Sequence, residues 1–459
     1  MKLILGILCF SQLVLAVSPD KKTLPIGLAP HEKGVLLREG PMTEPPMGPI
    51  RSLGEWELAD SAITLWQNPT YVSALQQRGK LALLADTSAD KKSWESWLNS
   101  QNIPLDNITI YVVPTDSIWI RDYGPWYILD GRGTLGIIDT QYNRPRPNDD
   151  VVPTFLSRAL DLPLFQPGLT HTGGNYYSDG LGNAFSSTLV FRENSSLPKN
   201  EVLQRMKDYL GIERYTTSKL APGITIEHLD TFGKLVAPDT WVFSDFPEGS
   251  RYRNDSETMV ALLKTLKSPY GTPYKIHRLK MTPISGSGEN YRAYLNAFIS
   301  NGTLYFPTYG GMADQNAKST FQTALPGYEI LGVPAQGTEW GDSVHCRTNN
   351  FYAKDTLFVF PEVKTRAVAG KPTPVIAEVY PSPGASIDKA PQLIWEVNGN
   401  QEPPIPMKLT SERFYEAEIP AQPAATQIDF YISASDSRGK IKTAPIRAPE
   451  MKISFAVAP

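Results

Sequence analysis

Five times along this chain, a polar residue stands in front of a strand-like run, a tight turn and a second strand-like run. The polar residues are Asp122, Asn175, Asp230, Asn296 and Cys346, and successive ones are 53, 55, 66 and 50 residues apart. A period near fifty with one supersecondary unit in each repeat is typical of repeat architectures. Five such units closed into a ring would form an α/β propeller, with the five polar residues converging on its central axis.

Helical patterns of apolar residues lie between these hairpins. In residues 200–210, one face of the expected helix carries Val202, Leu203, Met206 and Leu210. Similar patterns occur in residues 91–99, 256–266 and 317–325. Each repeat is therefore expected to combine strands with a helix, as the blades of an α/β propeller do.

The character of the sequence changes near residue 370. From Val375 onward it contains strand patterns and turns, and the clearest strands are residues 392–397, 413–419 and 427–435. Asn398-Gly399 and Ser437-Arg438-Gly439 are typical turn sequences between such strands. We predict an α/β propeller over residues 51–368, followed by an all-β sandwich of the immunoglobulin type over residues 373–459.

The first residues have the layout of a secretory signal peptide. Lys2 is followed by an apolar run from Leu3 to Val17, with small residues near its end. We expect residues 1–18 to be removed and residues 19–50, which are rich in proline, to be irregular. No other stretch resembles a transmembrane anchor, so the mature protein is expected to be secreted to the extracellular space, or to the periplasm in a host that exports across an inner membrane alone.

The chain has two cysteines, Cys9 in the expected signal peptide and Cys346. A mature chain with one cysteine forms no internal disulfide, and a lone thiol is often an inert buried residue. However, His345 and Arg347 flank Cys346, and polar, cationic neighbours favour a reactive thiolate. The net charge of -3 excludes a broad electrostatic attraction to nucleic acids or membranes.

Three stretches carry the residues with the clearest chemistry: SIWIRDYGPW (117–126), IEHLD (226–230) and SVHCRT (343–348). Together with HTGGN (171–175) and SDGLG, they resemble the guanidino-group-modifying enzymes, which share the fivefold α/β propeller called the pentein fold. These motifs occur in agmatine deiminases and in bacterial, Porphyromonas-type peptidylarginine deiminases. The segment QYNRPRPNDD (141–150) and the appended immunoglobulin-like domain resemble the second group. The resemblance covers almost the whole mature chain.

The resemblance implies hydrolysis of an arginine guanidinium to citrulline and ammonia. A guanidinium is planar and always charged, and paired carboxylates can hold it by two-point hydrogen bonds. Asp122 and Asp230 are the candidate carboxylates, although either could instead cap a turn. Because an opposite charge stabilises both of them, their ionisation should be coupled to the binding of the substrate.

Cys346 is the expected nucleophile, which would attack the guanidinium carbon to give a covalent thiouronium intermediate. His228 is the expected general acid and base: it would protonate the departing ammonia and then activate water. A lone histidine is more often structural, and the match to the family motif favours the catalytic role.

Other residues near these motifs have supporting roles in the expected site. The family places an asparagine beside the nucleophile, at the position of Asn296, whose amide can both donate and accept; a turn-supporting role is the alternative. Trp119 could cover the guanidinium face by a cation–π contact or pack in the core. Asn175 and His171 are expected to be structural. If its segment is extended, His345 should point away from the nucleophile.

Arg144 and Arg146 would determine the substrate. The prolines of RPRP favour an extended loop, in which residues two apart face the same side. The resemblance implies that this pair grips the carboxylate of a C-terminal arginine; the alternative is a solvated basic loop balanced by Asp149 and Asp150. The chain departs from the family at Thr225, where the family has a tyrosine that helps to bind the peptide.

Several expectations concern ligands and alternative functions. No His/Cys cluster has zinc spacing and no segment resembles the calcium-binding modules of vertebrate peptidylarginine deiminases, so we expect catalysis without metal or organic cofactor. The expected partners are peptides or proteins with C-terminal arginine, in preference to internal arginine. The alternatives are a secreted deiminase of agmatine or free arginine, a cysteine hydrolase of acyl groups, and a non-catalytic adhesin. The sequence does not determine the oligomeric state.

Overall fold

The structure is a computed structural model that describes residues 24–459 except 36, 38, 39, 221–225, 285, 287, 288, 336, 337, 339, 353–355 and 364–366. The predicted signal peptide, Cys9 and Thr225 lie outside the described residues. Within these residues, no helix is both long enough and apolar enough to cross a membrane.

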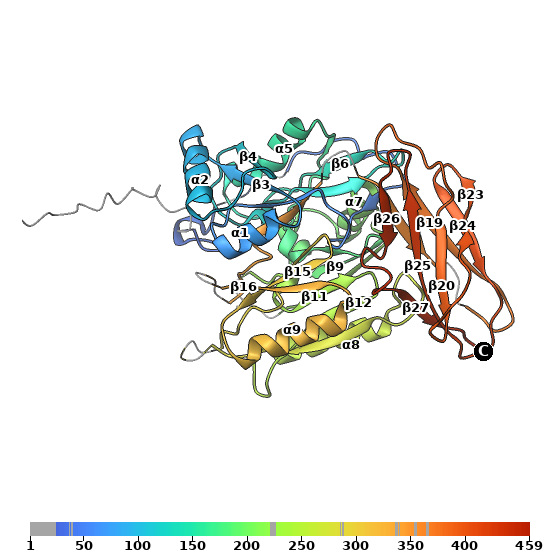
Figure 1. The fold of residues 1–459 in the computed structure, drawn as a ribbon. Helices are drawn as coiled ribbons and strands as arrows, with labels where there is room; N and C mark the ends of the chain where they lie inside the picture. Colours follow the sequence, from blue (N-terminus) through green and yellow to red (C-terminus); the bar gives the residue numbers. More distant parts are fainter. Residues whose placement is uncertain are drawn as a thin grey trace, which may run out of the picture.

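Residues 51–351 form five small sheets (Figure 1). The first consists of β1 (Arg51–Ser52), β5 (Trp126–Leu129), β6 (Leu135–Ile138) and β7 (Leu164–Phe165). The second consists of β8 (Tyr177–Ser178), β9 (Asn183–Ser187) and β10 (Arg214–Ser218). The third and fourth are β11 (Gly233–Ala237), β12 (Thr240–Asp245) and β13 (Lys275–Lys280), and β14 (Phe298–Ser300), β15 (Thr303–Thr308) and β16 (Glu329–Pro334). The fifth consists of β17 (Thr348–Phe351), β2 (Ser61–Thr64), β3 (Lys80–Ala85) and β4 (Ile108–Val112).

Every sheet repeats one pattern, an antiparallel pair followed by a parallel strand. A helix makes each parallel crossover, as this connection requires. The main crossover helices are α1 (Pro69–Gln76), α2 (Ser88–Ser100), α5 (Val152–Leu160), α7 (Lys199–Leu210), α8 (Arg253–Thr265) and α9 (Met312–Ala324). These include the four helices predicted from apolar spacing.

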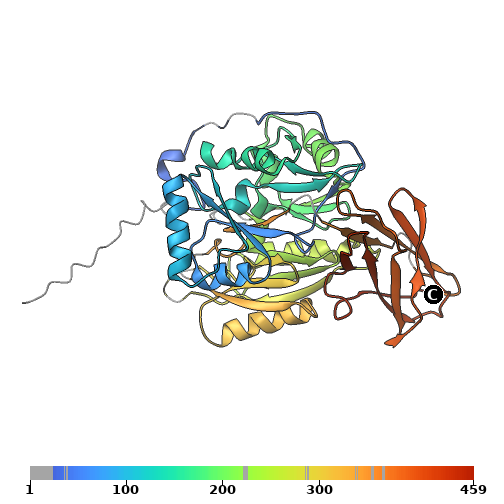
Figure 2. The ribbon, with the colours of Figure 1, turned by 45° about the horizontal axis from the view of Figure 1, so that its top comes forward.

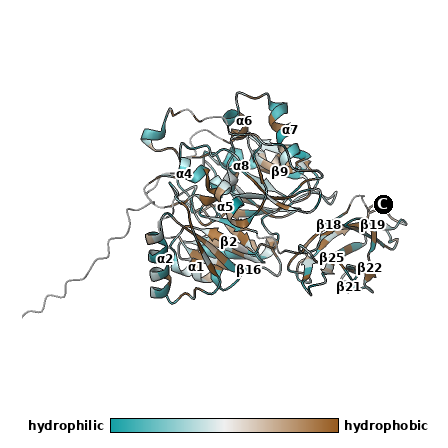
Figure 3. Cartoon of the chain, turned by 90° about the horizontal axis from the view of Figure 1, so that it is seen from above, coloured by the Kyte–Doolittle hydropathy of each residue, from teal (hydrophilic) through white to brown (hydrophobic). Residues whose placement is uncertain are grey.

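The helices lie on the outside of this region and bury one face. Figure 3 shows α2 as largely hydrophilic and β2, in the interior of the same region, as hydrophobic. In α7 the buried face consists of Val202, Met206, Tyr209 and Leu210. Leu203, which was predicted to share this face, is half-buried. The helix ends at Gly211, whose φ of 69° is the left-handed conformation that favours glycine.

The fifth sheet closes in a way that the local hairpin pattern did not predict. β17, which follows Cys346, pairs antiparallel with β2 from the beginning of the region, in the register Thr348–Thr64 to Phe351–Ser61. The second strand of the expected fifth hairpin is β18 (Phe358–Glu362), and it pairs with β19 (Thr373–Tyr380) of the C-terminal region instead. The sheet of the C-terminal region therefore begins before the boundary expected at residues 368–373.

The C-terminal region contains two sheets of antiparallel strands. One has the order β18, β19, β24 (Phe414–Ile419) and β23 (Lys408–Ser411). The other is built on β20 (Gln392–Val397), β21 (Asn400–Gln401), β25 (Gln427–Ser435) and β26 (Ile441–Ala444), with β22 (Ile405–Pro406) and β27 (Ile453–Ala456) at its sides. In β25, residues alternate strictly between buried and half-buried, as predicted.

The β-rich region lies against one side of the five sheets, and the N-terminal residues lie on the other side (Figures 1 and 2). At the contact, Glu378 of β19 accepts hydrogen bonds from Arg51 of β1, with Nε–Oε2 at 2.9 Å, and from Arg413, with Nε–Oε1 at 2.9 Å. The bond from Arg51 joins strands that are far apart in the chain, since Arg51 and Glu378 are separated by 327 positions.

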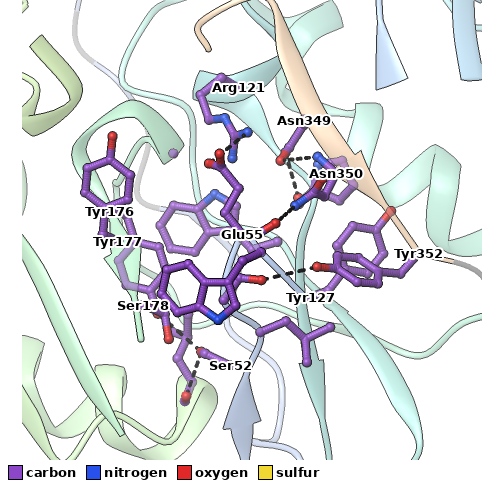
Figure 4. A pocket seen from close by; sticks show the side chains of 17 residues that line it. Ser52, Glu55, Arg121, Tyr127, Tyr176, Tyr177, Ser178, Asn349, Asn350 and Tyr352 are labelled. Carbon is purple, nitrogen blue, oxygen red and sulfur yellow. Dashed lines mark hydrogen bonds and ion pairs between the residues drawn. The ribbon is translucent and has the colours of Figure 1, made fainter. Parts of the chain in front are cut away.

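The carboxylate of Glu55 joins residues from four of the five sheets or the turns beside them, and Figure 4 shows it among its neighbours. Its Oε1 accepts from Lys234 Nζ of β11 at 2.5 Å and from the Ile299 amide of β14 at 2.7 Å. Its Oε2 accepts from His345 Nε2 at 2.8 Å and lies 3.3 Å from Arg121 Nη2. The second sheet contributes Tyr177 of β8, whose ring lies 5.2 Å from Lys234 Nζ.

The buried negative charge of Glu55 is balanced by the basic groups around it. Burial alone would raise the pKa of Glu55, but the charges of Lys234, His345 and Arg121 outweigh it and hold the pKa far below its ordinary value. Burial lowers the pKa of Lys234 to about 8, with Glu55 opposing this shift. Both groups are therefore ionised near pH 7.

We expect Glu55→Gln to destabilise the protein strongly, because it leaves the fully buried Lys234 and its neighbour Arg121 without a counter-charge. Breaking a buried pair in this way typically costs about 3–5 kcal/mol. The free energy of unfolding in urea would measure this loss, with Glu418→Gln, an exposed glutamate on β24, as the matched control. A loss no larger than that of the control would contradict the central role of Glu55.

Candidate active site

Asp122 lies in α3 (Ile120–Tyr123), a single helical turn that precedes β5. Gly124 ends this turn with a φ of 95°, a left-handed value that favours glycine. Asp122 is 1% exposed, and among the described residues neither carboxylate oxygen has a hydrogen bond of normal geometry, although the Gly174 amide is close enough to lower its pKa. A buried carboxylate with so little compensation is costly, and this indicates a binding role over the alternative of a turn cap.

Asp230 lies in the 3-10 turn η4 (Leu229–Thr231) and is also buried. Its Oδ2 accepts from Asn296 Nδ2 at 3.1 Å, interacts with His345 Nδ1 at 2.8 Å and lies 3.7 Å from Cys346 Sγ. Its Oδ1 has no partner among the described residues. Three of its neighbours therefore fix one oxygen, and the other is left to bind a ligand.

The thiol of Cys346 is held by Asn296. The Asn296 Nδ2 group lies 3.1 Å from Cys346 Sγ, and its Oδ1 accepts the backbone amides of His345 at 3.1 Å and Cys346 at 3.2 Å. One amide side chain thus fixes both the backbone turn and the sulfur. Asn296 thus lies beside Cys346, its catalytic role stays a prediction, and an N–H donor pointing at sulfur stabilises a thiolate.

The expectation that cationic neighbours activate the thiol is wrong. Arg347 points away and pairs with Asp342, while its guanidinium carbon lies 4.8 Å from the Trp66 ring and 5.4 Å from the Trp119 ring. Burial and the nearby carboxylates, above all Asp230, raise the pKa of Cys346 well above its ordinary value. A positive charge at the thiol must therefore come from a ligand.

His228 lies next to Asp122 on the other side of the same space. Its Nδ1 is 3.5 Å from Asp122 Oδ1 and makes no hydrogen bond, whereas its Nε2 pairs with Thr172 Oγ1 at 3.0 Å. Burial lowers the pKa of His228 to about 3, so the ring is neutral without a ligand. The free Nδ1 is therefore the nitrogen available for proton transfer.

Gly174 marks the point on which these groups converge. A Cβ built on Gly174 would lie 2.6 Å from His228 Nδ1, 2.9 Å from Asp122 Oδ1 and 3.1 Å from Asp230 Oδ2. Any side chain at this position would fill the space between His228 Nδ1, Asp122 Oδ1 and Asp230 Oδ2. A planar cation with several N–H donors, such as a guanidinium, matches these acceptors in charge and in hydrogen bonding.

Asp122 and Asp230 lie close together, and the charge of Asp230 disfavours the ionised form of Asp122. Burial raises the pKa of Asp122 to about 8; the charge of Asp230 adds to this shift, while Arg144 and Arg146 oppose it. Asp122 is thus largely protonated at neutral pH without a ligand, and a bound cation would restore its charge. This is the coupling between ligand and ionisation expected from the residue types.

His345 does not point away from the site, as an extended segment would have placed it. Residues 344–347 form a turn, and the ring contacts Asp230 through Nδ1 and Glu55 through Nε2, both at 2.8 Å. Sequence reasoning missed this link because it assumed a strand. Burial lowers the pKa of His345.

His171 and Asn175 have the structural surroundings that were expected. The Nδ1 atom of His171 accepts the Thr172 amide at 2.8 Å, so its Nε2 donates to Tyr215 Oη at 2.6 Å. Asn175 Oδ1 accepts the Ser187 amide at 2.8 Å. Thr172, which follows His171, is the partner of His228, and no sequence pattern pointed to it.

Arg144 and Arg146 do not lie on an extended loop; that prediction is wrong. The chain bends so that the Arg146 amide donates to the Arg144 carbonyl at 2.8 Å. The alternative of a solvated basic loop balanced by Asp149 and Asp150 is also wrong, because Arg144 is 7% exposed and Arg146 is 2% exposed. Asp149 Oδ2 instead accepts from Ser117 Oγ at 2.6 Å.

Trp119 is 4% exposed and lies in an apolar cluster with Tyr123 and Cys346. The cation near its ring is Arg347 of the same chain, so packing accounts for its position, and its contact with a substrate stays a prediction. Among the described residues, no group of three or more His, Cys, Asp or Glu is arranged to hold a metal ion.

A separate cavity of about 70 Å³ lies on the other side of Glu55 (Figure 4). Glu55, Arg121, Gly173, Tyr177 and Asn350 contribute to its wall, whereas Cys346, His228, Asp122 and Asp230 do not. The candidate active site is therefore defined by its convergent side chains and not by this cavity.

Comparisons with known proteins agree with this site. The profile of the Porphyromonas-type peptidyl-arginine deiminase family matches residues 56–351. A protein of Selenomonas ruminantium assigned as an agmatine deiminase is 25% identical over 350 residues, which cover 66% of this chain and 91% of that protein. A Streptococcus mutans protein with the same assignment is 25% identical over 280 residues, 53% of this chain and 76% of that protein.

Two solved structures share the fold. The agmatine deiminase of Enterococcus faecalis has a TM-score of 0.58 at 19% identity and covers 66% of this chain and 96% of that chain. A Porphyromonas gingivalis protein described as an arginine deiminase has a TM-score of 0.59 at 21% identity, with 66% of this chain and 98% of that chain covered.

We expect Gly174→Ala to abolish turnover of guanidinium substrates while the protein still folds. Its methyl group would occupy the space among His228, Asp122 and Asp230, and a misplaced reacting group typically costs at least about 100-fold in rate. Citrulline release and thermal unfolding would be measured together. Gly173→Ala is the contrasting variant: its Cβ would lie 2.1 Å from the Arg121 carbonyl oxygen, and we expect loss of the fold. Activity of Gly174→Ala above a tenth of wild type would contradict this binding point.

We expect Asp122→Asn to be inactive and, above about pH 6, more stable than the wild type. A folded-state pKa of about 8 against an ordinary value of 3.8 means that ionisation of Asp122 opposes folding increasingly as pH rises between these values. The gain in Tm should therefore be small near pH 4 and largest at pH 8–9. Asp106→Asn, at an exposed position, is the control. A lower Tm for Asp122→Asn at pH 8 would contradict the unpaired state of this carboxylate.

Proposed function

The chain belongs to the Porphyromonas-type peptidyl-arginine deiminase family, and from this we propose that it is a secreted protein-arginine deiminase that converts C-terminal arginine residues to citrulline. More broadly, the family consists of hydrolases that act on guanidino C–N bonds. The observation that carries the proposal is the grouping of His228 Nδ1 and one oxygen each of Asp122 and Asp230 around Gly174, with the Cys346 thiol 3.7 Å from the same Asp230 oxygen.

In this proposal, Asp122 and Asp230 bind the substrate guanidinium from its edges. The cation ionises Asp122 and lowers the cost of forming a thiolate at Cys346, both by charge attraction in a site shielded from water. Binding and activation are therefore the same event. A ligand without positive charge would leave the thiol neutral and unreactive.

The first half-reaction forms a covalent intermediate on Cys346. The thiol transfers its proton to the neutral His228 and attacks the guanidinium carbon, forming a C–S bond. His228 then gives this proton to one guanidinium nitrogen, the C–N bond breaks and ammonia leaves. The thiouronium that remains keeps the positive charge that Asp122 and Asp230 stabilise.

The second half-reaction releases citrulline. His228, neutral again, takes a proton from a water molecule, whose oxygen attacks the thiouronium carbon. The C–S bond breaks, the ureido group forms, and the thiol and one proton are regenerated. No step requires a metal ion or an organic cofactor, so the activity is expected to be independent of calcium.

The choice of substrate rests on Arg144 and Arg146. Both are buried, and Arg146 already binds a carboxylate, that of Glu32, with Nε–Oε1 at 2.8 Å. Bidentate binding of carboxylates is what arginine provides best. A substrate with a free carboxylate beside its arginine side chain would supply such a group, whereas an internal arginine would not.

We further infer that the five sheets are the blades of a five-bladed α/β propeller of the pentein type. The C-terminal sheets, with their antiparallel order, are consistent with an immunoglobulin-like sandwich. Export by the predicted signal peptide would place the enzyme outside the cell or in the periplasm, where it would act on peptides and proteins.

Agmatine deiminase activity is the second candidate. Two relatives are assigned this activity, and agmatine is an arginine side chain without the carboxylate. The ion pair between Glu32 and Arg146 favours this candidate, since it already neutralises one of the two arginines.

We expect formation of a ureido product from a peptide that ends in arginine, and little from a peptide of the same composition with an internal arginine or from agmatine. Colorimetric assay of the ureido group in the presence of excess chelator measures all three. Cys346→Ala should reduce the signal to background. Arg144→Gln combined with Arg146→Gln should raise KM for the C-terminal peptide with a smaller change in kcat, because these residues bind a group remote from the reacting carbon.

The outcomes separate the two candidates. Turnover of agmatine alone would retain the chemistry and replace the substrate. Turnover of none of the three by a folded enzyme would contradict the proposed function.

A further inference from the structure

The residues that would carry out the reaction are closed off from solvent. Cys346, His228 and Asp230 are 0% exposed, and Asp122 is 1% exposed. A peptide with a C-terminal arginine cannot reach them unless part of the chain moves. The segment that contacts the proposed carboxylate-binding arginines is residues 24–33, which we name the N-terminal strap.

The strap binds both arginines. Arg144 donates to the Ile26 carbonyl from Nε at 3.3 Å and from Nη2 at 3.2 Å. Arg146 Nη2 donates to the carbonyls of Pro25 at 2.8 Å and Gly27 at 2.9 Å. The Arg146 guanidinium also forms a two-point ion pair with Glu32, with Nε–Oε1 at 2.8 Å and Nη2–Oε2 at 3.1 Å.

Glu32 is positioned for this ion pair by its own local structure. It ends the 3-10 turn η2 (Pro30–Glu32), and its Oε2 also accepts the Ala29 amide at 2.7 Å. Its side chain is 4% exposed. Burial would raise the pKa of Glu32, but the hydrogen bonds from Arg146 and Ala29 outweigh it and lower the pKa, so the group is a carboxylate at neutral pH.

The arginines are held in place from the other side, independently of the strap. Asp150 Oδ1 accepts the Tyr142 amide at 2.7 Å, and Asp149 accepts Ser117 Oγ, which ties this loop to the residues just before Asp122. Tyr142 also packs against Tyr123, with ring centroids 5.7 Å apart. The arginine pair is thus fixed relative to the active site, while the strap contributes a separate stretch of chain.

Glu32 is the carboxylate that directly contacts the pair. Arg146 is paired with Glu32, but its Nη1 is buried and has no hydrogen-bond partner among the described residues. The hydrogen bonds of Arg144 go to the carbonyls of Ile26 and Asn143. The charge of Arg144 also acts at longer range and lowers the pKa values of Asp122 and Glu193. A second carboxylate entering this site would have to replace Glu32 or share the pair with it.

We propose that Glu32 is a specificity-determining residue that occupies the place of the substrate's C-terminal carboxylate, so that substrates with this group bind only when they displace the strap. The inference rests on the proposed function of Arg144 and Arg146. The inference predicts that Glu32 competes only with substrates that carry a C-terminal carboxylate. Agmatine and amidated peptides lack this group and would not bind Arg144 and Arg146 through it.

The test compares the wild type, Glu32→Gln and Lys33→Gln in the full chain. Glu32→Gln keeps the size of the side chain and removes its charge; Lys33 is exposed and adjoins Glu32, and is the matched control. The substrates are a peptide ending in arginine, the same peptide with a C-terminal amide, and agmatine. KM and kcat are determined separately, and thermal unfolding verifies that each variant is folded.

We expect Glu32→Gln to lower KM for the free-acid peptide about tenfold, the effect of a binding-competent state that rises from about a tenth of the population to most of it. KM for the amide and for agmatine should change less than twofold, as should all values for Lys33→Gln. A higher KM for the free-acid peptide, or an equal change for all substrates, would overturn the inference, since Glu32 would then be a fixed part of the wall.

The outcome remains decisive if the proposed substrate is wrong. Should the wild type turn over agmatine alone, new turnover of the free-acid peptide by Glu32→Gln would support the role of Glu32, and its absence would overturn that role.

A second measurement needs no variant of the strap. In Cys346→Ala, a saturating free-acid peptide should speed cleavage after Lys33 by a lysine-specific protease, because the displaced strap becomes accessible. Agmatine at saturation should not speed it. Equal cleavage with and without the free-acid peptide would overturn the displacement.

Discussion

The active site depends on a carboxylate that does not take part in the reaction. Glu55 is surrounded by Lys234, Arg121 and His345, and each of these belongs to a different part of the five-sheet region. Buried charges of one sign would drive the sheets apart, whereas one acid among several bases draws them to a common centre. His345, held by Glu55, also contacts Asp230, and Asp230 in turn contacts the thiol of Cys346. The geometry of the nucleophile is therefore set by the same charges that hold the sheets together.

The reacting groups show the opposite electrostatic arrangement. Asp122, Asp230 and Cys346 face one another without a cation, and the pKa values of Asp122 and Cys346 are accordingly raised. The neutral His228 adds no charge. Where Glu55 is fully neutralised, the site beside Gly174 has an excess of acidic groups that a guanidinium would balance. In a family of guanidino-modifying hydrolases, this difference is what the proposed mechanism requires: a buried thiol that stays protonated until a cation binds.

Much of the site could be predicted from the sequence, because the types of Cys346, Asp122 and Asp230 limit their chemistry and the family motifs contain His228 and Asn296. The errors occurred where a local pattern was assumed to continue. The RPRP loop is bent, with Asp149 bonded to Ser117 and Asp150 to Tyr142 of the same loop, and His345 contacts Asp230 because its segment is a turn. Glu55 and Glu32 could not be found at all, since their partners are distant: 290 residues separate Glu55 from His345, and 114 separate Glu32 from Arg146.

The pairing of β17 with β2 has a consequence for the order in which the protein is made. The strand that follows Cys346 pairs with residues 61–64, so this sheet joins segments from the two ends of the five-sheet region. Contacts of such sequence separation form slowly. A chain still on the ribosome contains Asp122, His228 and Asp230 well before Cys346 is made, and β17 can pair with β2 only after residues 348–351 have been added. The candidate site is therefore expected to be assembled late in folding.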